Sequence, residues 1–333
     1  MPGQSGGAVL QRQPVKPDKT APLTLNIRIA SSQNVVENAD LSGPKKDLVK
    51  EISNDLRNQF LKHLQDRLAF LKSDKIKVTI SFGQFADKDL KLAGNIQVWL
   101  VPELDQSFAA GAVMKKKYKY SDKAAQDVNA EFADDPTGGP GKDPQQAAGL
   151  TVGSTVDPKD AQSGRPIFVK LRESFVSRGG LSTDMSEYKA GRKVAAQERI
   201  NDLATTTLHE LGHLFGNKHT EGNLVPFTAN DPKSKLKYKQ SFPPKIMDTV
   251  SLRGRPVNDG HEVITKEEIE KLGGWTKFLK LLEHPSIKKA HLKGEDMEVW
   301  YDYSKLEFDE DQKTAMKSFS EFLRGAKNNG VSK

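Results

Sequence analysis

Three of the seven histidines in this chain lie within residues 209–219, in the segment HELGHLFGNKH. His209 and His213 are four residues apart, so on a helix their rings project from the same face, one turn apart. Two imidazole nitrogens at this spacing can reach one zinc ion at about 2.0–2.1 Å. We expect the helix to end at Gly216, because glycine readily adopts the positive φ of a helix exit. The chain can then turn back so that His219 supplies a third nitrogen ligand.

The residue after the first histidine favours a catalytic metal site over a structural one. Glu210 lies one step further round the helix, which places its carboxylate beside a metal ion and not among the ligands. Three protein ligands leave a fourth position for water, and Glu210 can take a proton from that water as a general base. Two histidines at this spacing are usually surface residues that bind no metal. The probability that the full pattern arises by chance in a chain of this composition is on the order of 10⁻⁵.

The complete pattern HExxHxxGxxH resembles the zinc-binding signature of the metzincin clan of metallopeptidases. The clan also carries a methionine-bearing turn, and Met247 in the segment KIMD at 245–248 occupies a matching place. The resemblance implies that Met247 forms an apolar floor beneath the three histidines, whereas the simpler interpretation is an ordinary core methionine. The specific match covers only residues 209–248. Thr220 after the third histidine leaves the family within the clan unassigned, and Thr249 replaces the tyrosine ligand of some members.

The resemblance also implies an activity and a fold. The activity is that of a zinc-dependent endopeptidase, with one catalytic Zn²⁺ and Glu210 activating the attacking water to hydrolyse peptide bonds in protein substrates. The fold is α+β, with a twisted mixed β-sheet, a long backing helix and an active-site helix at the floor of a cleft, followed by a helical C-terminal extension. Substrate would lie extended along an edge strand, and residues 149–156 and 165–171 are both candidates for that strand.

Hydrophobic periodicity predicts the elements that must position these residues. Period-two alternation predicts strands, and a four-residue repeat predicts long helices. A nearly continuous apolar run at 96–101 suits the centre of a sheet. The strand–helix–strand opening predicts a parallel pair joined by a right-handed crossover. The expected strands are 23–29, 76–82, 96–101 and 165–171, and the expected helices are 45–72, 186–215, 265–282 and 309–325.

Composition shifts divide the chain into three parts. Residues 1–21 are expected to be a flexible tail, because they lack apolar periodicity. Residues 22–283 would form the catalytic domain, with a glycine- and proline-rich insertion at about 104–164. Residues 284–333 would form the helical C-terminal extension, which either packs on the core or serves as a docking element.

Composition also excludes several classes of protein. The chain has 333 residues and no cysteine, which excludes disulfides, thiolate zinc sites, a cysteine nucleophile and latency through a cysteine on the metal. No apolar run approaches the roughly 18 residues of a membrane span, and no cleavable signal core is visible. We expect a soluble chain that stays in the cytoplasm or leaves by a signal-independent route. Residues 6–13 resemble leaders of bacterial secreted or injected cargo, so a delivered effector is an alternative role.

The net charge of +7, from 51 basic and 44 acidic residues, suits an acidic protein or peptide substrate. Lysine and tyrosine alternate at 115–120 and 233–239, a combination that can bind single-stranded nucleic acid. Solvated loops are the commoner case, so we do not expect nucleic-acid binding. The alternative function is a non-catalytic, metal-stabilised module that binds an anionic partner through these basic loops. We expect a monomer, and we expect His63, on the first helix, to be partly solvated.

Overall fold

The computed structural model describes residues 22–32, 35, 48–92, 94–102, 106–126, 149–152, 166–171, 190–220, 224–228, 237–248 and 261–328. The expected tail at 1–21 lies outside the described residues, as does the glycine- and proline-rich part of the expected insertion at 134–148.

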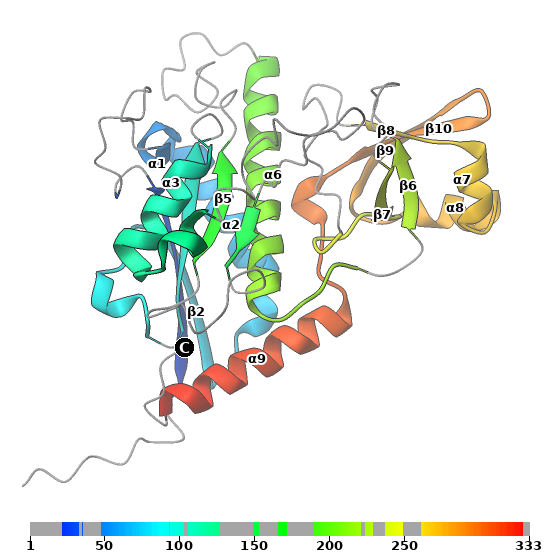
Figure 1. The fold of residues 1–333 in the computed structure, drawn as a ribbon. Helices are drawn as coiled ribbons and strands as arrows, with labels where there is room; N and C mark the ends of the chain where they lie inside the picture. Colours follow the sequence, from blue (N-terminus) through cyan, green and yellow to red (C-terminus); the bar gives the residue numbers. More distant parts are fainter. Residues whose placement is uncertain are drawn as a thin grey trace, which may run out of the picture.

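The main sheet has five strands in the order β2-β1-β3-β5-β4 (Figure 1). Its strands are β1 (Leu23–Ser31), β2 (Ile76–Phe82), β3 (Asn95–Pro102), β4 (Gly149–Thr151) and β5 (Ile167–Leu171). The neighbouring strands from β2 to β5 pair in parallel, and β4 pairs antiparallel with β5. The parallel pairing of β1 with β2 confirms the expected strand–helix–strand opening. Of the two candidates for the edge strand, β4 lies at the edge, whereas β5 lies between β3 and β4.

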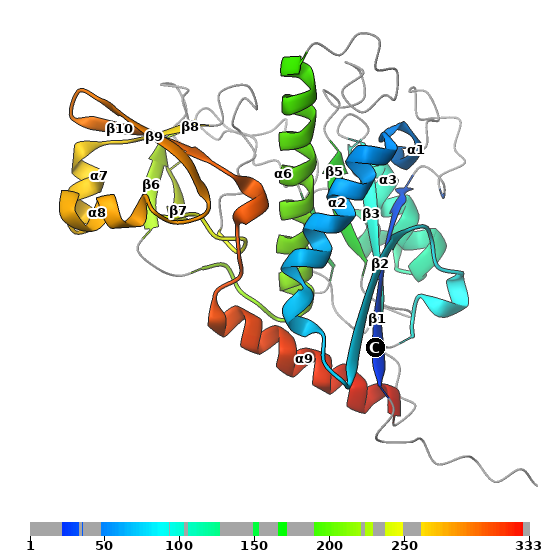
Figure 2. The same cartoon turned by 180° about the vertical axis from the view of Figure 1, so that it is seen from behind.

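Two helices cover one face of this sheet, α2 (Asn54–Arg67) and α6 (Ala190–Leu214). They lie side by side in Figure 2, and the Gln59 side-chain amide donates to Asn201 across their interface. The alternating residues of β1 are fully buried beneath them, as the period-two pattern predicts: Leu23, Leu25, Ile27 and Ile29. The helix expected at 45–72 is divided into α1 (Leu48–Glu51) and α2, because the Ser53 hydroxyl caps the new start by accepting from Leu56 N.

The opposite face is covered by α3 (Gln106–Val113) and the π-helical turn η4 (Met114–Tyr118). Trp99 of β3 is buried there, and its indole N–H donates to the Tyr118 hydroxyl over 3.1 Å. Because β3 packs against both layers, almost every residue of its central run is apolar. The first part of the expected insertion therefore belongs to the core, since Met114 and Tyr118 are both buried.

A second group of elements has its own small core (Figure 1). It contains the hairpin β6 (Leu224–Thr228) and β7 (Lys237–Ser241), and the antiparallel sheet β8 (His261–Ile264), β10 (Asp296–Tyr301) and β9 (Ile287–Lys293). The helix expected at 265–282 is divided into α7 (Lys266–Lys271) and α8 (Trp275–Leu281). Gly273 and Gly274 separate them with φ of 103° and 79°, a conformation in which a helix cannot continue.

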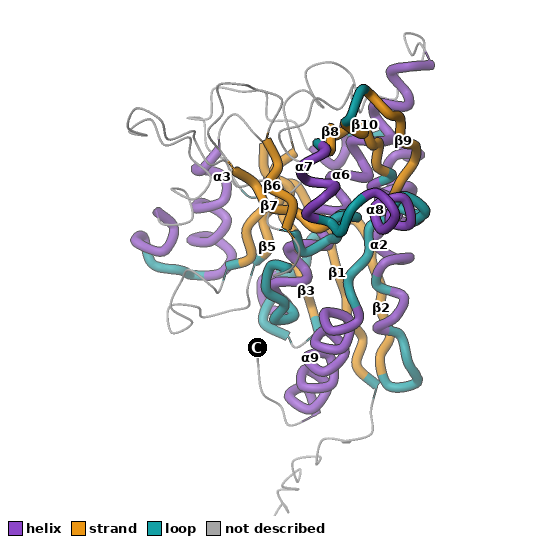
Figure 3. The backbone as a smooth tube through the Cα atoms, turned by 90° about the vertical axis from the view of Figure 1, so that its right-hand side faces the viewer, coloured by secondary structure: helices purple, strands orange, loops and turns teal. Residues whose placement is uncertain are grey.

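The segment 284–333 differs from the helical extension expected for it. Strand β10 pairs with β8 on one side and with β9 on the other, so the boundary expected at residue 283 divides a sheet. The last helix, α9 (Glu310–Asn328), runs across the end of the main sheet, at the lower end of the molecule in Figure 3. Its Met316 and Leu323 lie in the main core, so α9 packs on the core. No helix among the described residues is long and apolar enough to cross a membrane.

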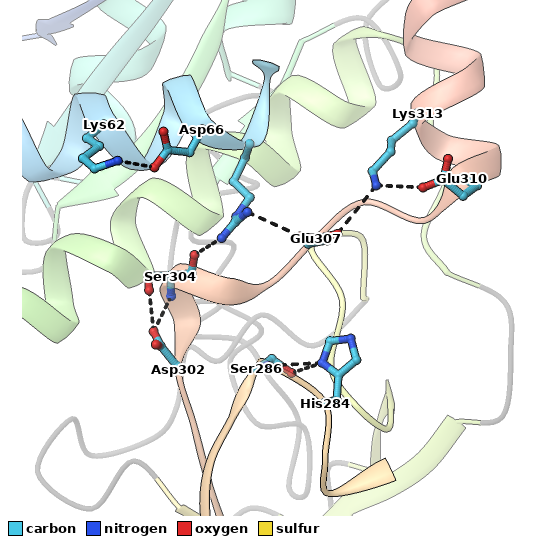
Figure 4. A network of polar contacts seen from close by, with 10 residues as sticks. Lys62, Asp66, His284, Ser286, Asp302, Ser304, Glu307, Glu310 and Lys313 are labelled. Atoms are coloured by element: carbon cyan, nitrogen blue, oxygen red, sulfur yellow. Dashed lines mark hydrogen bonds and ion pairs between the residues drawn. The ribbon is translucent and has the colours of Figure 1, made fainter. Parts of the chain in front are cut away.

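Polar contacts fasten the segment before α9 to α2 (Figure 4). The Arg67 guanidinium donates to the carbonyl oxygen of Ser304 and forms an ion pair with Glu307 at 3.5 Å. Glu307 also lies 3.6 Å from the Lys313 ammonium group. The C-terminal segment is therefore joined to the first long helix by charged contacts as well as by apolar packing.

His63 lies inside the core, contrary to the partial solvation expected for it. Its side chain is 5% exposed between Phe60 and Leu64 of α2. Burial, together with the nearby charge of Arg67, lowers the pKa of His63 from 6.5 to about 4, against smaller opposing effects of Asn201, Asp302 and Asp66. The imidazole is therefore neutral in the folded protein at neutral pH.

We expect His63 to make the protein sensitive to acid. The unfolded chain binds the proton near pH 6.5 and the folded one only near pH 4, so stability falls as pH is lowered through this window. Substitution His63→Leu should remove this loss, which amounts to at most about 3 kcal/mol. Urea unfolding at about pH 7 and about pH 4.5 measures the difference. The exposed His291→Leu is the control, and an unchanged acid loss in His63→Leu would contradict the prediction.

Candidate metal centre

The C-terminal end of α6 presents His209 and His213 one turn apart. The helix then ends as expected: Gly216 has φ of 91°, Gly216 N donates to His213 O, and Asn217 N donates to Gly212 O. These two hydrogen bonds form a Schellman motif, which satisfies carbonyl groups left free at the helix end. The left-handed residue reverses the chain, and His219 returns to the same site.

The three histidines converge through their Nε2 atoms. His213 Nε2 lies 3.0 Å from His209 Nε2 and 3.1 Å from His219 Nε2. One ligand atom from each ring lies within 4.8 Å of the others, so the three could together hold a metal ion. Nitrogen ligands arranged tetrahedrally around zinc are about 3.3 Å apart, given a metal–nitrogen distance of about 2.0–2.1 Å. The separations of His213 Nε2 from the other two nitrogens, 3.0 and 3.1 Å, are close to that arrangement.

Backbone carbonyls orient two of the rings. His209 Nδ1 lies 2.7 Å from Ile246 O, and His213 Nδ1 lies 2.9 Å from Asn217 O. A carbonyl oxygen can only accept, so each Nδ1 carries a proton, and Nε2 of the neutral ring keeps its lone pair. Two lone pairs facing each other at 3.0 Å repel unless a cation lies between them. The donor set and its hydrogen-bonded partners therefore fit a metal ion.

The turn at 245–248 packs against this site and against α6. Besides the Ile246 carbonyl on His209, Met247 O accepts from Thr220 N over 2.8 Å, next to the third histidine. Met247 is fully buried, and its sulfur occupies the space that a Cβ on Gly212 would need. The Asp248 carboxylate closes the turn by accepting from Lys245 N over 2.8 Å. The methionine thus contacts the histidine-bearing helix at a glycine between its two ligands.

Glu210 points toward the edge strand β4, from the helix face next to that of the histidines. Its side chain is 3% exposed, and its Oε2 accepts from the Thr151 hydroxyl at 2.9 Å. A Cβ added to Gly149 would lie 2.5 Å from Glu210 Oε1. The carboxylate is therefore enclosed by two residues of β4, while the histidine rings gather on the neighbouring face of the helix.

The start of α9 contacts the same centre. The Gln312 side-chain amide donates to the Thr220 hydroxyl over 3.3 Å, beside His219. Ile246 N donates to Glu307 O, and Phe308 Cε1 lies 3.1 Å from the place of a Cβ on Gly212. Residues 307–312 thus support both the turn at 245–248 and the third histidine. A chain region far downstream of the histidine pattern completes the structure around it.

The solvent exposure of the three histidine side chains increases in chain order. His209 is buried, His213 is intermediate and His219 is exposed. The centre is therefore open to solvent on the side of His219 and closed on the side of the core. A site that is covered on one side and reachable from the other can admit a ligand or substrate to a remaining coordination position.

The structure brings the three predicted histidines together, and it places the other predicted residues on or against the helix that carries two of them. The three histidines converge, Glu210 lies beside them in sequence and on the adjacent helix face, Gly216 ends the helix and Met247 packs on it. Sequence analysis missed Gly149, Thr151, Gly212 and Gln312. Gly212 had a signal, because glycine inside a helix costs stability and often has a packing reason. Gly149 and Thr151 lie in the segment 149–156 that was one candidate for the edge strand, but nothing local to them or to Gln312 indicates a partner far away in the chain.

The basic stretch at 115–120 does not fit nucleic-acid stacking. Tyr118 and Tyr120 are 1% and 6% exposed, so neither ring is available to a base. The side chains of the second stretch, at 233–239, lie outside what the structure describes.

Comparisons with protein-family models, with curated proteins and with solved structures give no match for this chain. The residues of the site and their geometry therefore carry the functional argument.

We expect metal binding to stabilise the fold. A divalent ion such as Zn²⁺ should raise the free energy of unfolding by about 2.7 kcal/mol at a concentration of 100 times its dissociation constant. Calorimetric unfolding with and without the ion, and with a chelator, measures this gain. The control is His219→Ala, which removes one of the three ligands and should lose most of the effect. Equal gains in the two proteins would show that the ion binds elsewhere.

We expect Gly212→Ala to destabilise the protein. The added methyl group would occupy the position of the Met247 sulfur, which is fully buried and has no solvent to move into. Overpacking of this kind costs about 1–3 kcal/mol. Gly325→Ala in α9 is a matched control, because a Cβ there meets nothing within 4 Å. That substitution should stabilise α9 by about 0.5–1 kcal/mol. Denaturant unfolding compares the two, and a neutral Gly212→Ala would contradict the close approach.

Proposed function

We propose that this protein is a zinc-dependent endopeptidase of metzincin type that hydrolyses peptide bonds in protein substrates. The observation that carries the proposal is the convergence of three Nε2 atoms at 3.0 and 3.1 Å, together with a buried glutamate at the position after His209 on the same helix. The pattern HExxHxxGxxH and the methionine at 247 support the same assignment. Histidine nitrogens suit zinc, although they also bind copper, nickel and iron.

The proposed mechanism assigns metal binding, proton transfer and ring orientation to different residues. His209, His213 and His219 would hold the ion through their Nε2 atoms. When bound, zinc supplies Lewis acidity, which polarises a peptide carbonyl and lowers the pKa of water. The Glu210 carboxylate accepts a proton from the attacking water and returns it to the departing amine. The carbonyls of Ile246 and Asn217 keep two rings in the tautomer that this arrangement needs.

The edge strand β4 is the proposed support for an extended substrate. It lies at the end of the strand order and contacts Glu210 directly. A peptide that adds to a sheet edge gains main-chain hydrogen bonds and brings its scissile bond close to the residues beneath that edge. An acidic substrate and a monomeric state remain predictions from the sequence.

The rival function is a metal-stabilised binding module without catalysis. Such a module would need the three histidines, but it would have no use for a buried carboxylate at position 210. The position of Glu210 against β4 favours the enzyme.

We expect Glu210→Ala to retain zinc and lose turnover, because it removes the proton acceptor and leaves the three histidines in place. The loss should be about 10²–10⁴-fold. Cleavage of casein, with cut sites mapped by mass spectrometry and zinc content measured in parallel, tests this. His213→Ala is the matched control that should lose both zinc and activity. A Glu210→Ala variant that cuts at the wild-type rate contradicts the mechanism, and one zinc per chain without any cleavage by wild type favours the binding module.

A further inference from the structure

Two residues of the edge strand hold the glutamate that follows the first histidine. Gly149 and Thr151 are two positions apart on β4, so they face the same side of the strand. That side is turned to Glu210 of α6, as the hydroxyl contact at position 151 and the missing Cβ at position 149 both show. We propose that Thr151 is a positioning residue that fixes the orientation of the Glu210 carboxylate. This inference rests on the proposed peptidase function.

The Thr151 hydroxyl contacts Glu210 at two points. It lies 2.9 Å from Oε2 of the side chain and 2.7 Å from the backbone carbonyl oxygen of the same residue. The hydroxyl carries one proton, so it donates to one of these oxygens at a time. Because both oxygens belong to Glu210, the one hydroxyl fixes the position of the carboxylate relative to the backbone of its own residue on α6. The side-chain torsions between them are thereby restricted.

Burial makes this contact effective. Thr151 is 7% exposed and Glu210 is 3% exposed, so water has little access to either group. A hydrogen bond to a carboxylate oxygen in such surroundings is stronger than one at the surface. Loss of the donor would leave a buried carboxylate without this partner, which costs stability and allows the side chain to reorient.

Gly149 supplies the space in which the carboxylate lies. A Cβ at this position would be 2.5 Å from Oε1 and 2.6 Å from Cγ of Glu210. Any larger residue would therefore displace the glutamate from the strand. The two oxygens of the carboxylate are thus held differently, Oε1 beside the glycine and Oε2 beside the hydroxyl. The strand proposed to carry the substrate is also the strand that orients the base.

The kinetic test compares Thr151→Val with Thr151→Ser. Valine keeps the shape and removes the hydroxyl, whereas serine keeps the hydroxyl. We expect kcat on a peptide substrate to fall about tenfold or more in Thr151→Val, with KM and zinc content unchanged. Thr151→Ser should restore kcat to near that of wild type. The matched control is Thr207→Val on α6, whose hydroxyl donates to Leu203 O of its own helix and should not affect kcat.

A second measurement tests the contact without using activity. The melting temperatures of wild type, Thr151→Val, Glu210→Ala and the double variant form a double-mutant cycle, measured with and without zinc. We expect Thr151→Val to lower Tm by more when Glu210 is present than when it is alanine. Thr207→Val should lower Tm equally in both backgrounds, because its hydroxyl does not contact Glu210.

The outcomes separate this inference from the proposed function. Additive Tm shifts for Thr151 and Glu210 would show that the contact is absent and would overturn the inference. Coupled shifts with an unchanged kcat in Thr151→Val would also overturn it, because the contact would then be structural only. A zinc-loaded wild type without any turnover would overturn the proposed function. The double-mutant cycle alone would then decide whether Thr151 orients Glu210.

Discussion

Close packing against α6 at two glycines is the constraint on which the candidate metal centre depends. At Gly212 the absent Cβ leaves room for the sulfur of Met247, and at Gly149 on β4 it leaves room for the carboxylate of Glu210. Both neighbours are buried, so neither could move into solvent if a larger side chain were present. The helix that carries the histidines is thus held between the edge strand on one side and the turn at 245–248 on the other.

The centre is assembled from segments that are distant in the chain. Two of the candidate ligands come from α6, and the backbone carbonyl groups of residues 217 and 246 orient their rings. The third candidate ligand is followed by Thr220, whose N–H donates to Met247 O and whose hydroxyl accepts from Gln312. The segment before α9 is in turn tied to α2 through Arg67. The segment 307–312 therefore contributes to the site without supplying any of the three histidine ligands.

The main sheet followed from sequence because its strands alternate or are continuously apolar, and β1, β2, β3 and β5 lie near the expected positions. Helix breaks were harder to predict. The cap at Ser53 divides one expected helix, and the glycine pair at 273 and 274 divides another, although the apolar pattern continues through both. Strand β9 escaped prediction because nearly all of its residues are exposed, so its pairing with β10 leaves little trace in its pattern. His63 is buried where α2 packs on α6, which is far away in sequence and provides the neighbouring Asn201.

The sequence by itself determined the three candidate ligands and the helix end. The spacing of His209 and His213 is a property of one helical turn, and the reversal at Gly216 needs only a residue that accepts positive φ. Tertiary structure alone decided which strand forms the edge, which carbonyls orient the rings and which hydroxyl holds Glu210. The reason is physical: helical spacing acts between residues a few positions apart, whereas Thr151 and Glu210 meet only after the sheet has formed and α6 has packed against β4.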